Sequence, residues 1–265
     1  MNPNRDFLEQ AVKHIRLTLE SVRPALLEAQ GNIEHRLKDD ASVVTEMDTF
    51  VENKLKAALA EFDGGIAFGG EETGVDYSKE TFWLADPIDG TEQFIRGIPM
   101  STNMLSLIHN NEPVLGIVYN FELGDFYHAI QGNGAYRNGH AIHVSDRKPD
   151  RAWITASVKA GEPFGLIDEL RKLVKSVRNF GAAGFDYSLI ASGGLDGTIR
   201  YHGHGSPWDF APTTLLVQEA DGRVVNIGSN SYDYRQKNHI AASPAIFDLL
   251  KKYMDTVDTH GDGAT

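Results

Sequence analysis

The feature that most constrains this fold is an apolar run that leads directly into two carboxylates. Residues 82–85 are apolar and predict a buried strand, which we expect to end at Pro87 because proline cannot donate to a β-ladder. Asp86 and Asp89 stand at the end of that strand, and residues 90–91 open a short helical turn. Carboxylates are oxygen ligands for divalent metals, and the free N–H groups of a helix start can bind phosphate. An ordinary acidic turn with a helix cap would show the same spacing, so this stretch alone does not identify a metal site.

Composition limits the class of protein. The chain has 265 residues, 41% of them hydrophobic, which is enough for one large or two moderate cores. Its formal net charge of −12 argues against a surface for nucleic acid or anionic membrane. It has no cysteine and no apolar run long enough to span a membrane, and from its polar N-terminus we expect no signal peptide. We therefore expect a cytoplasmic protein without disulfides.

The first half of the chain predicts two helices followed by an antiparallel meander. Apolar residues recur every three or four positions over 8–26, as in an amphipathic helix that Pro24 would kink or end. After a short strand over 33–38, a second helix begins near Thr45, and Asp48 in its first turn could cap the helix or serve catalysis. The strands expected next are residues 66–68, 82–85, 104–108, 114–119, 126–130 and 141–144.

The second half alternates strands and helices, which is typical of an α/β fold. The expected strands are 153–155, 177–180, 198–201, 223–225 and 239–242, and the expected helices are 166–174, 185–191, 208–220 and 244–254. A polar segment over 145–150 marks the boundary that we expect inside a single domain of residues 1–255. It would separate an N-terminal α+β lobe, 1–146, from a C-terminal α/β lobe, 150–255, and the small polar residues 256–265 would form a disordered tail.

Four carboxylates follow predicted strands or open predicted helices in distant parts of the chain: Glu71, Asp86, Asp89 and Asp209. If the fold brings them together, their burial and mutual repulsion would be costly without cations. Two or three divalent ions would remove that cost, and a pair of metal ions can activate water and hold a phosphate. No His or Cys cluster competes for a softer metal, which favours Mg²⁺.

Three blocks of the sequence resemble motifs of the inositol monophosphatase superfamily. Residues 70–72 match its GEE, and residues 86–91, DPIDGT, match its DP(I/L/V)DGT. Residues 207–209 and 219–222 match its WD…EAGG segment, with aspartate in place of the first glycine. The resemblance extends to about residue 254 and implies a layered αβαβα fold, similar to inositol monophosphatase and fructose-1,6-bisphosphatase.

The resemblance also implies roles for individual residues. Two or three Mg²⁺ ions would be held by Glu71, Asp86, the main-chain carbonyl of Ile88, Asp89 and Asp209. Catalysis would fall to Thr91, whose hydroxyl bonds to Asp48 and orients the attacking water, and to Glu71. The expected substrate contacts are Asp89, Gly90, Thr91, Gly181, Ala182, Ala183, Asp209 and one or both of Arg200 and His202.

The choice between Arg200 and His202 bears on the substrate. Inositol-phosphate members carry a carboxylate shortly before the WD block that contacts sugar hydroxyls. Counting forward from residues 193–194 places Arg200 there, whereas counting back from Asp209 places His202 there. Neither is an acid, and a base would favour a second anionic group on the substrate.

The activity implied is that of a Mg²⁺-dependent, lithium-sensitive phosphomonoesterase, which hydrolyses an inositol monophosphate-like or sugar phosphate ester with metal-activated water. Alternatives on the same scaffold are a 3′(2′),5′-bisphosphate nucleotidase, a histidinol-phosphate phosphatase and a fructose-1,6-bisphosphatase. A non-catalytic binding or regulatory member would have lost a metal ligand, and none is lost here. Because members are commonly homodimers, we expect a homodimer that binds a small phosphate ester and neither nucleic acid nor membrane.

Overall fold

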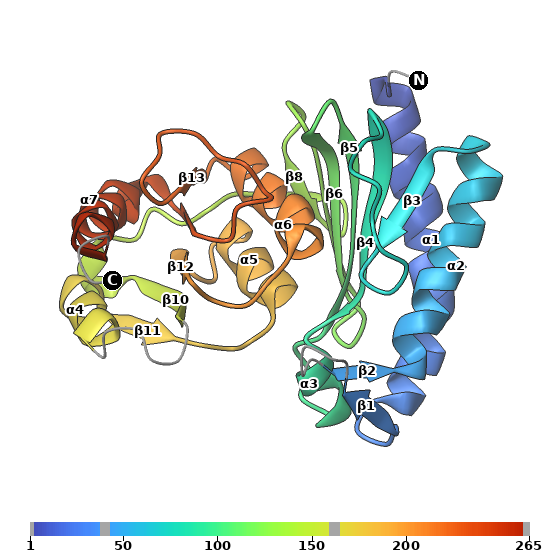
Figure 1. The fold of residues 1–265 in the computed structure, drawn as a ribbon, viewed down its shortest axis with the longest axis horizontal. Coiled ribbons are helices and arrows are strands. Elements are labelled where there is room, and N and C mark those ends of the chain that lie inside the picture. The colour runs from blue at the N-terminus through green and yellow to red at the C-terminus, as the bar shows by residue number, and fades with distance from the viewer. Residues whose placement is uncertain (1–2, 38–42, 159–164, 262–265) are drawn as a thin grey trace.

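The computed structural model describes residues 3–37, 43–158 and 165–261 of the chain. Its elements form five layers, helix, sheet, helix, sheet, helix, which Figure 1 shows side by side from right to left. This arrangement confirms the predicted αβαβα fold. None of the helices in these described ranges is long and apolar enough to cross a membrane.

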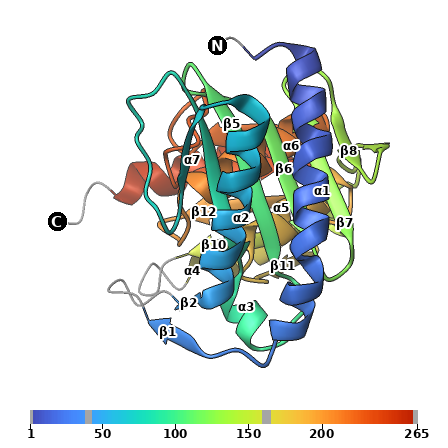
Figure 2. The ribbon, with the colours of Figure 1, turned by 90° about the vertical axis from the view of Figure 1, so that its right-hand side faces the viewer.

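The first layer is a pair of long helices, α1 (Arg5–Ala29) and α2 (Glu46–Asp63). Figure 2 shows them lying together across one face of the larger sheet. Their apolar stripes pack on that sheet in a core that includes Ile15, Leu26 and Leu55. The expected end of the first helix at Pro24 is not observed, because the buried Val22 and Leu26 on either side of the proline anchor α1 to this core.

The larger sheet has seven strands in the order β3-β4-β5-β6-β7-β8-β9. These are β3 (Ala67–Gly70), β4 (Thr81–Asp89), β5 (Thr102–His109), β6 (Glu112–Asn120), β7 (Asp125–Ile130), β8 (Ala135–Arg137) and β9 (His140–Ile142). Only β3 and β4 are parallel, and the rest form the expected meander. A two-stranded ladder of β1 (His35–Leu37) and β2 (Val43–Thr45) precedes α2.

The smaller sheet has five strands in the order β11-β10-β12-β14-β13. They are β10 (Trp153–Val158), β11 (Ser176–Arg178), β12 (Gly197–Tyr201), β13 (Arg223–Asn226) and β14 (His239–Ala242). The helices α5 (Ala183–Ala191) and α6 (Pro207–Glu219) fill the space between the two sheets, and α4 (Gly165–Leu173) and α7 (Pro244–Gly261) cover the outer face. The chain passes from one sheet to the other between Ile142 and Trp153, through the short 3₁₀ helix Pro149–Arg151.

Two expected ends differ from the structure. The β4 strand continues through Pro87 to Asp89, because a register irregularity takes up the proline. The α7 helix continues to Gly261, so residues 256–261 are helical and not the expected disordered tail. Met254 is buried and Val257 packs against the outer core, which stabilises the extra turns. Residues 262–265 lie outside the described part of the chain.

Candidate active site

A bulge in β4 turns Asp86 and Asp89 toward one cavity. Asp86 pairs with Met104 of β5 and Asp89 pairs with Thr102, so three steps along β4 match two along β5. In a regular strand, residues three apart would face opposite sides of the sheet. The extra residue removes that alternation, and an oxygen of each carboxylate lies within 4.8 Å of the other and of one Asp209 oxygen.

The third carboxylate of the cluster, Asp209, comes from the first turn of α6. Pro207 is the first helical residue, and the Asp209 carboxylate accepts a hydrogen bond from the main-chain N–H of Ser206 at 2.5 Å. This capping bond fixes the side chain at the end of the helix that faces β4. Local sequence signals therefore position Asp209, and the layered fold brings it to Asp86 and Asp89.

The loop after β3 carries Glu71 into the same cavity. Its main-chain N–H donates to the Ala85 carbonyl at 3.1 Å, which continues the β3–β4 pairing. Beneath the loop, the buried Glu52 of α2 accepts a hydrogen bond from the Glu72 N–H at 3.1 Å. A Cβ at Gly70 would overlap the Glu52 carboxylate, so glycine is needed for this close approach.

Asp89 also connects strand β4 to the start of helix α5. Its carboxylate accepts hydrogen bonds from the main-chain N–H groups of Ala183, at 3.0 Å, and Gly184, at 2.7 Å, at the start of α5. Thr102 donates a third at 3.2 Å. The site therefore lies where α5 and α6 meet the larger sheet.

The three aspartates carry perturbed pKa values. Burial, together with the charges of Glu71, Asp209 and Asp89, raises the pKa of Asp86 well above its usual value. Burial and the nearby Asp209 raise the pKa of Asp89 to about 7, although its two main-chain donors act in the opposite direction. Burial also raises the pKa of Asp209. This is the electrostatic pattern expected when carboxylates are gathered without a compensating cation.

The expected hydrogen bond between Thr91 and Asp48 is not formed among the described residues. The Thr91 hydroxyl instead donates to the Ile88 carbonyl at 3.0 Å, in the first turn of α3 (Thr91–Ile95). The Asp48 carboxylate accepts from both the N–H and the hydroxyl of Thr45 at 2.7 Å. Asp48 is thus occupied by the capping box of α2, and it does not line the cavity.

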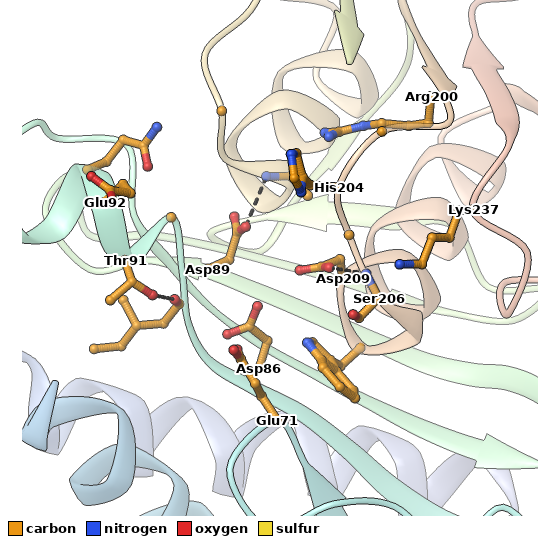
Figure 3. A pocket seen from close by; sticks show the side chains of 18 residues that line it. Glu71, Asp86, Asp89, Thr91, Glu92, Arg200, His204, Ser206, Asp209 and Lys237 are labelled. Carbon is orange, nitrogen blue, oxygen red and sulfur yellow. Dashed lines mark hydrogen bonds between the residues drawn. The ribbon is translucent and has the colours of Figure 1, made fainter. Parts of the chain in front are cut away.

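A cavity of about 430 Å³ surrounds the carboxylates. The predicted site residues that line it are Glu71, Asp86, Ile88, Asp89, Gly90, Thr91, Gly181, Ala183, Arg200 and Asp209. Ala182 does not, because it is fully buried against Gly90. Figure 3 shows Arg200 and Lys237 on one side of the carboxylates and Thr91 on the other.

The structure distinguishes Arg200 from His202. Arg200 lines the cavity, whereas His202 does not. A left-handed backbone at His202, with a φ of 51°, and a hydrogen bond from its N–H to Asn238 turn this residue outward, and its ring stacks on Tyr201. The substrate contact expected at His202 therefore stays a prediction that the cavity lining does not support.

Sequence reasoning missed several residues of the cavity wall. They are Glu92, Gln93, Gly203, Gly205, Ser206, Trp208 and Lys237. Residues 203–206 directly precede the WD block, and this position in the sequence could have placed them at the cavity. No sequence pattern could have placed Lys237 there, because it lies in a loop before β14 that only the tertiary fold brings to the site.

Comparison with known proteins agrees with this architecture. The model of the Inositol monophosphatase family matches residues 4–258. An inositol monophosphatase of Mesembryanthemum crystallinum is 28% identical, over 93% of this chain and 94% of its own length. The solved structure of a Thermotoga maritima IMPase superposes with a TM-score of 0.85 at 25% identity, covering 96% of this chain and 99% of its own. An IMPase/NADP phosphatase solved with Mg²⁺ and phosphate superposes with a TM-score of 0.82 at 22% identity, over 92% and 95% of the two chains.

Proposed function

Because this chain belongs to the inositol monophosphatase family, a family of phosphoric monoester hydrolases, we propose that it hydrolyses a small phosphorylated metabolite with Mg²⁺. The observation that carries the proposal is the convergence of Asp86, Asp89 and Asp209 in one buried cluster at the cavity floor. Glu71 and Thr91 line the same cavity. The candidate substrates are inositol monophosphate-like esters and sugar phosphates.

The residues present fit a divalent metal. Asp86 Oδ1 is buried and accepts no hydrogen bond from any described residue, which is costly for a carboxylate oxygen unless a cation binds it. All the donors are hard oxygen atoms, as Mg²⁺ prefers. We propose that Glu71, Asp86, the Ile88 carbonyl, Asp89 and Asp209 hold two or three ions. The Ile88 carbonyl has two lone pairs, and the Thr91 hydroxyl uses one of them.

When bound, Mg²⁺ would lower the pKa of water and neutralise phosphate charge. The protein residues orient the reacting groups around it. Thr91 places its hydroxyl beside the Ile88 carbonyl, where it can align the attacking water. The N–H groups of Gly90 and Thr91 can donate to the phosphate oxygens of the bound ester. In the proposed reaction, water attacks phosphorus and gives up a proton, the bond from phosphorus to the ester oxygen breaks, and that oxygen takes up a proton to leave as the alcohol.

Other features of this proposal come from the family resemblance. We propose that the enzyme is a homodimer, works in the cytoplasm and is inhibited by Li⁺, with Li⁺ taking the place of a weakly held Mg²⁺. Inhibition that is uncompetitive toward substrate and absent with equal Na⁺ would support the last point. Sedimentation or light scattering at micromolar protein would test the dimer.

The direct test of the function is phosphate release from p-nitrophenyl phosphate. We expect release that requires Mg²⁺, stops on addition of EDTA and returns when Mg²⁺ is restored in excess. The Asp209→Asn variant, which removes one charged ligand, serves as the matched control for contaminating phosphatases. Release that continues unchanged in EDTA, or in this variant, would contradict the proposed site.

A further inference from the structure

One wall of the cavity carries cations that hydrolysis itself does not require. Arg200 and Lys237 line the same cavity as the carboxylates. In Figure 3 they lie on the side of the C-terminal elements, and Thr91 lies across the carboxylates from them. Glu92, an acid on the Thr91 side, is paired with Arg96 at 3.1 Å. The cavity therefore has a carboxylate floor and a distinct cationic wall.

Arg200 is buried with most of its hydrogen-bonding capacity unused. Its side chain is 8% exposed, and its ion pair with Asp186 is long, 3.4 Å from Nη2 to Oδ2. Within the described part of the chain, the buried Arg200 Nε has no hydrogen-bond partner, and the guanidinium lies 5.6 Å from the centre of the Tyr187 ring. A guanidinium has five N–H donors, and leaving them unpaired in a buried site is costly. An anion in the cavity would supply acceptors for the donors that face it.

A buried aromatic network holds Arg200 and the Lys237 main chain in a fixed relation. His239 of β14 pairs in register with Arg200 of β12. Its Nδ1 lies 2.9 Å from the Lys237 carbonyl, which can only accept, so Nδ1 carries the proton. The His239 Nε2 then accepts from the Tyr187 hydroxyl. Burial and the Arg200 charge lower the pKa of His239 to about 3, so this network is neutral at pH 7.

We propose that Arg200 and Lys237 form a subsite for a second anionic group, so that the preferred substrate is a small phosphate ester that carries a further phosphate or carboxylate. The inference rests on the proposed function, with the phosphate that is cleaved bound at the carboxylate floor. Two cations match the charge of a second phosphate, and charge-assisted hydrogen bonds to guanidinium are the strong ones. A cavity of about 430 Å³ accommodates a small bis-anion of this kind. The second group binds and is not transferred.

The test compares matched pairs of esters that differ by one anionic group. The pairs are fructose 1,6-bisphosphate with fructose 1-phosphate, and 2-phosphoglycerate with glycerol 2-phosphate, so that the arms separate phosphate from carboxylate. The quantity measured is the ratio of kcat/KM within each pair, from Mg²⁺-dependent phosphate release. We expect a ratio above one in the wild type for at least one pair. In Lys237→Ala that ratio should fall by about tenfold, mainly through KM, the effect of losing one charge-assisted bond.

Controls keep the outcomes distinct. Lys237 is exposed, so its truncation leaves the fold intact, and Lys252→Ala on the outer helix α7 removes the same charge far from the cavity and should leave the ratio unchanged. In Arg200→Gln the ratio should also fall. An equal loss of kcat/KM for both members of each pair would show that Arg200 only balances the charge of the carboxylates, and would overturn its role in the subsite. A ratio near or below one in the wild type, or one that Lys237→Ala does not change, overturns the subsite while the phosphatase assignment stands. No Mg²⁺-dependent release from any of the four esters would overturn the proposed function and the inference with it.

Discussion

At the scale of single residues, Asp86 gives the clearest physical argument for the proposed cation. Its pKa is raised by burial and by three neighbouring carboxylates, so the metal-free protein is stabilised by a proton on this group. In Asp86→Asn, the amide can donate to Asp209 without taking up that proton. We expect the metal-free variant to melt higher at pH 8, by about 2–4 °C for each 1 kcal/mol gained, and its turnover to fall by about 100-fold or more. Calorimetry in EDTA and phosphate release in Mg²⁺ measure the two effects.

Asp89→Asn is the matched comparison for that variant. Asp89 uses both carboxylate oxygens to accept the N–H groups of Ala183 and Gly184, and an amide offers only one acceptor. This variant should therefore lose turnover without the gain in metal-free melting temperature. A similar gain in both variants would contradict the role given to the α5 contacts.

Thr91 is the residue whose hydroxyl we expect to orient the water. Thr91→Ala should lower kcat by about two to four orders of magnitude, the scale of a positioned proton-transfer group, and Thr91→Ser should retain much of the rate. If alanine turned over as fast as threonine, the hydroxyl bonded to Ile88 would be only a local helix contact.

At the scale of elements, the start of α5 depends on a glycine that sequence patterns did not single out. A Cβ at Gly184 would overlap Thr102 Oγ1 and lie 2.9 Å from Met104 Sδ. Gly184→Ala should push α5 away from Asp89 and lower the free energy of unfolding by about 1–3 kcal/mol. The fall in kcat should be larger than the unfolded fraction of the protein can explain. Gly165→Ala lies at the start of α4, where no atom of the described residues is near its Cβ position, and it should be neutral or stabilising. Denaturant titration and kinetics on the same preparations make the comparison.

The end of α6 carries the departure from the family motif at Asp221. The N–H of Gly222 donates to the Val217 carbonyl at 2.8 Å and that of Asp221 donates to Gln218 at 3.2 Å, which is a Schellman motif. Asp221 occupies its left-handed position with a φ of 68°, where glycine is favoured. Among the described residues, its side chain pairs only with the exposed His143, a contact that contributes little stability. Asp221→Gly should therefore raise stability by about 1 kcal/mol, which thermal melting would show, and unchanged or lower stability would contradict this reading.

At the scale of the whole molecule, local signals predicted the helices, the strands and the acidic positions, whereas the αβαβα layers were predicted from the resemblance to the inositol monophosphatase superfamily. Buried strands, helix caps and the spacing of Asp86 and Asp89 can all be read along the chain. The strand end at Pro87 was predicted wrongly, since a bulge depends on the partner strand. Arg200 and His202 could not be separated by counting, because the backbone turn at His202 is a tertiary feature. Lys237 was missed for the same reason, since the loop before β14 reaches the cavity only in the folded protein.

The last prediction concerns the molecule's response to metal and pH together. Asp89 has a pKa of about 7 in the folded metal-free protein, above the ordinary value of about 4 that it takes when unfolded. The folded state therefore binds more protons between these values, and this contribution to stability is present at low pH and lost as pH rises through 7. Mg²⁺ would displace those protons and supply the missing charge, so its binding should tighten as pH rises. We expect the rise in melting temperature caused by Mg²⁺ to be larger at pH 8 than at pH 5.5. Buried His239, whose pKa is lowered to about 3, destabilises the fold at low pH both with and without metal. Its effect therefore cancels in the difference between the melting temperatures measured with and without Mg²⁺ at the same pH. A Mg²⁺ increment that is equal at both pH values would show that these carboxylates do not bind the ion.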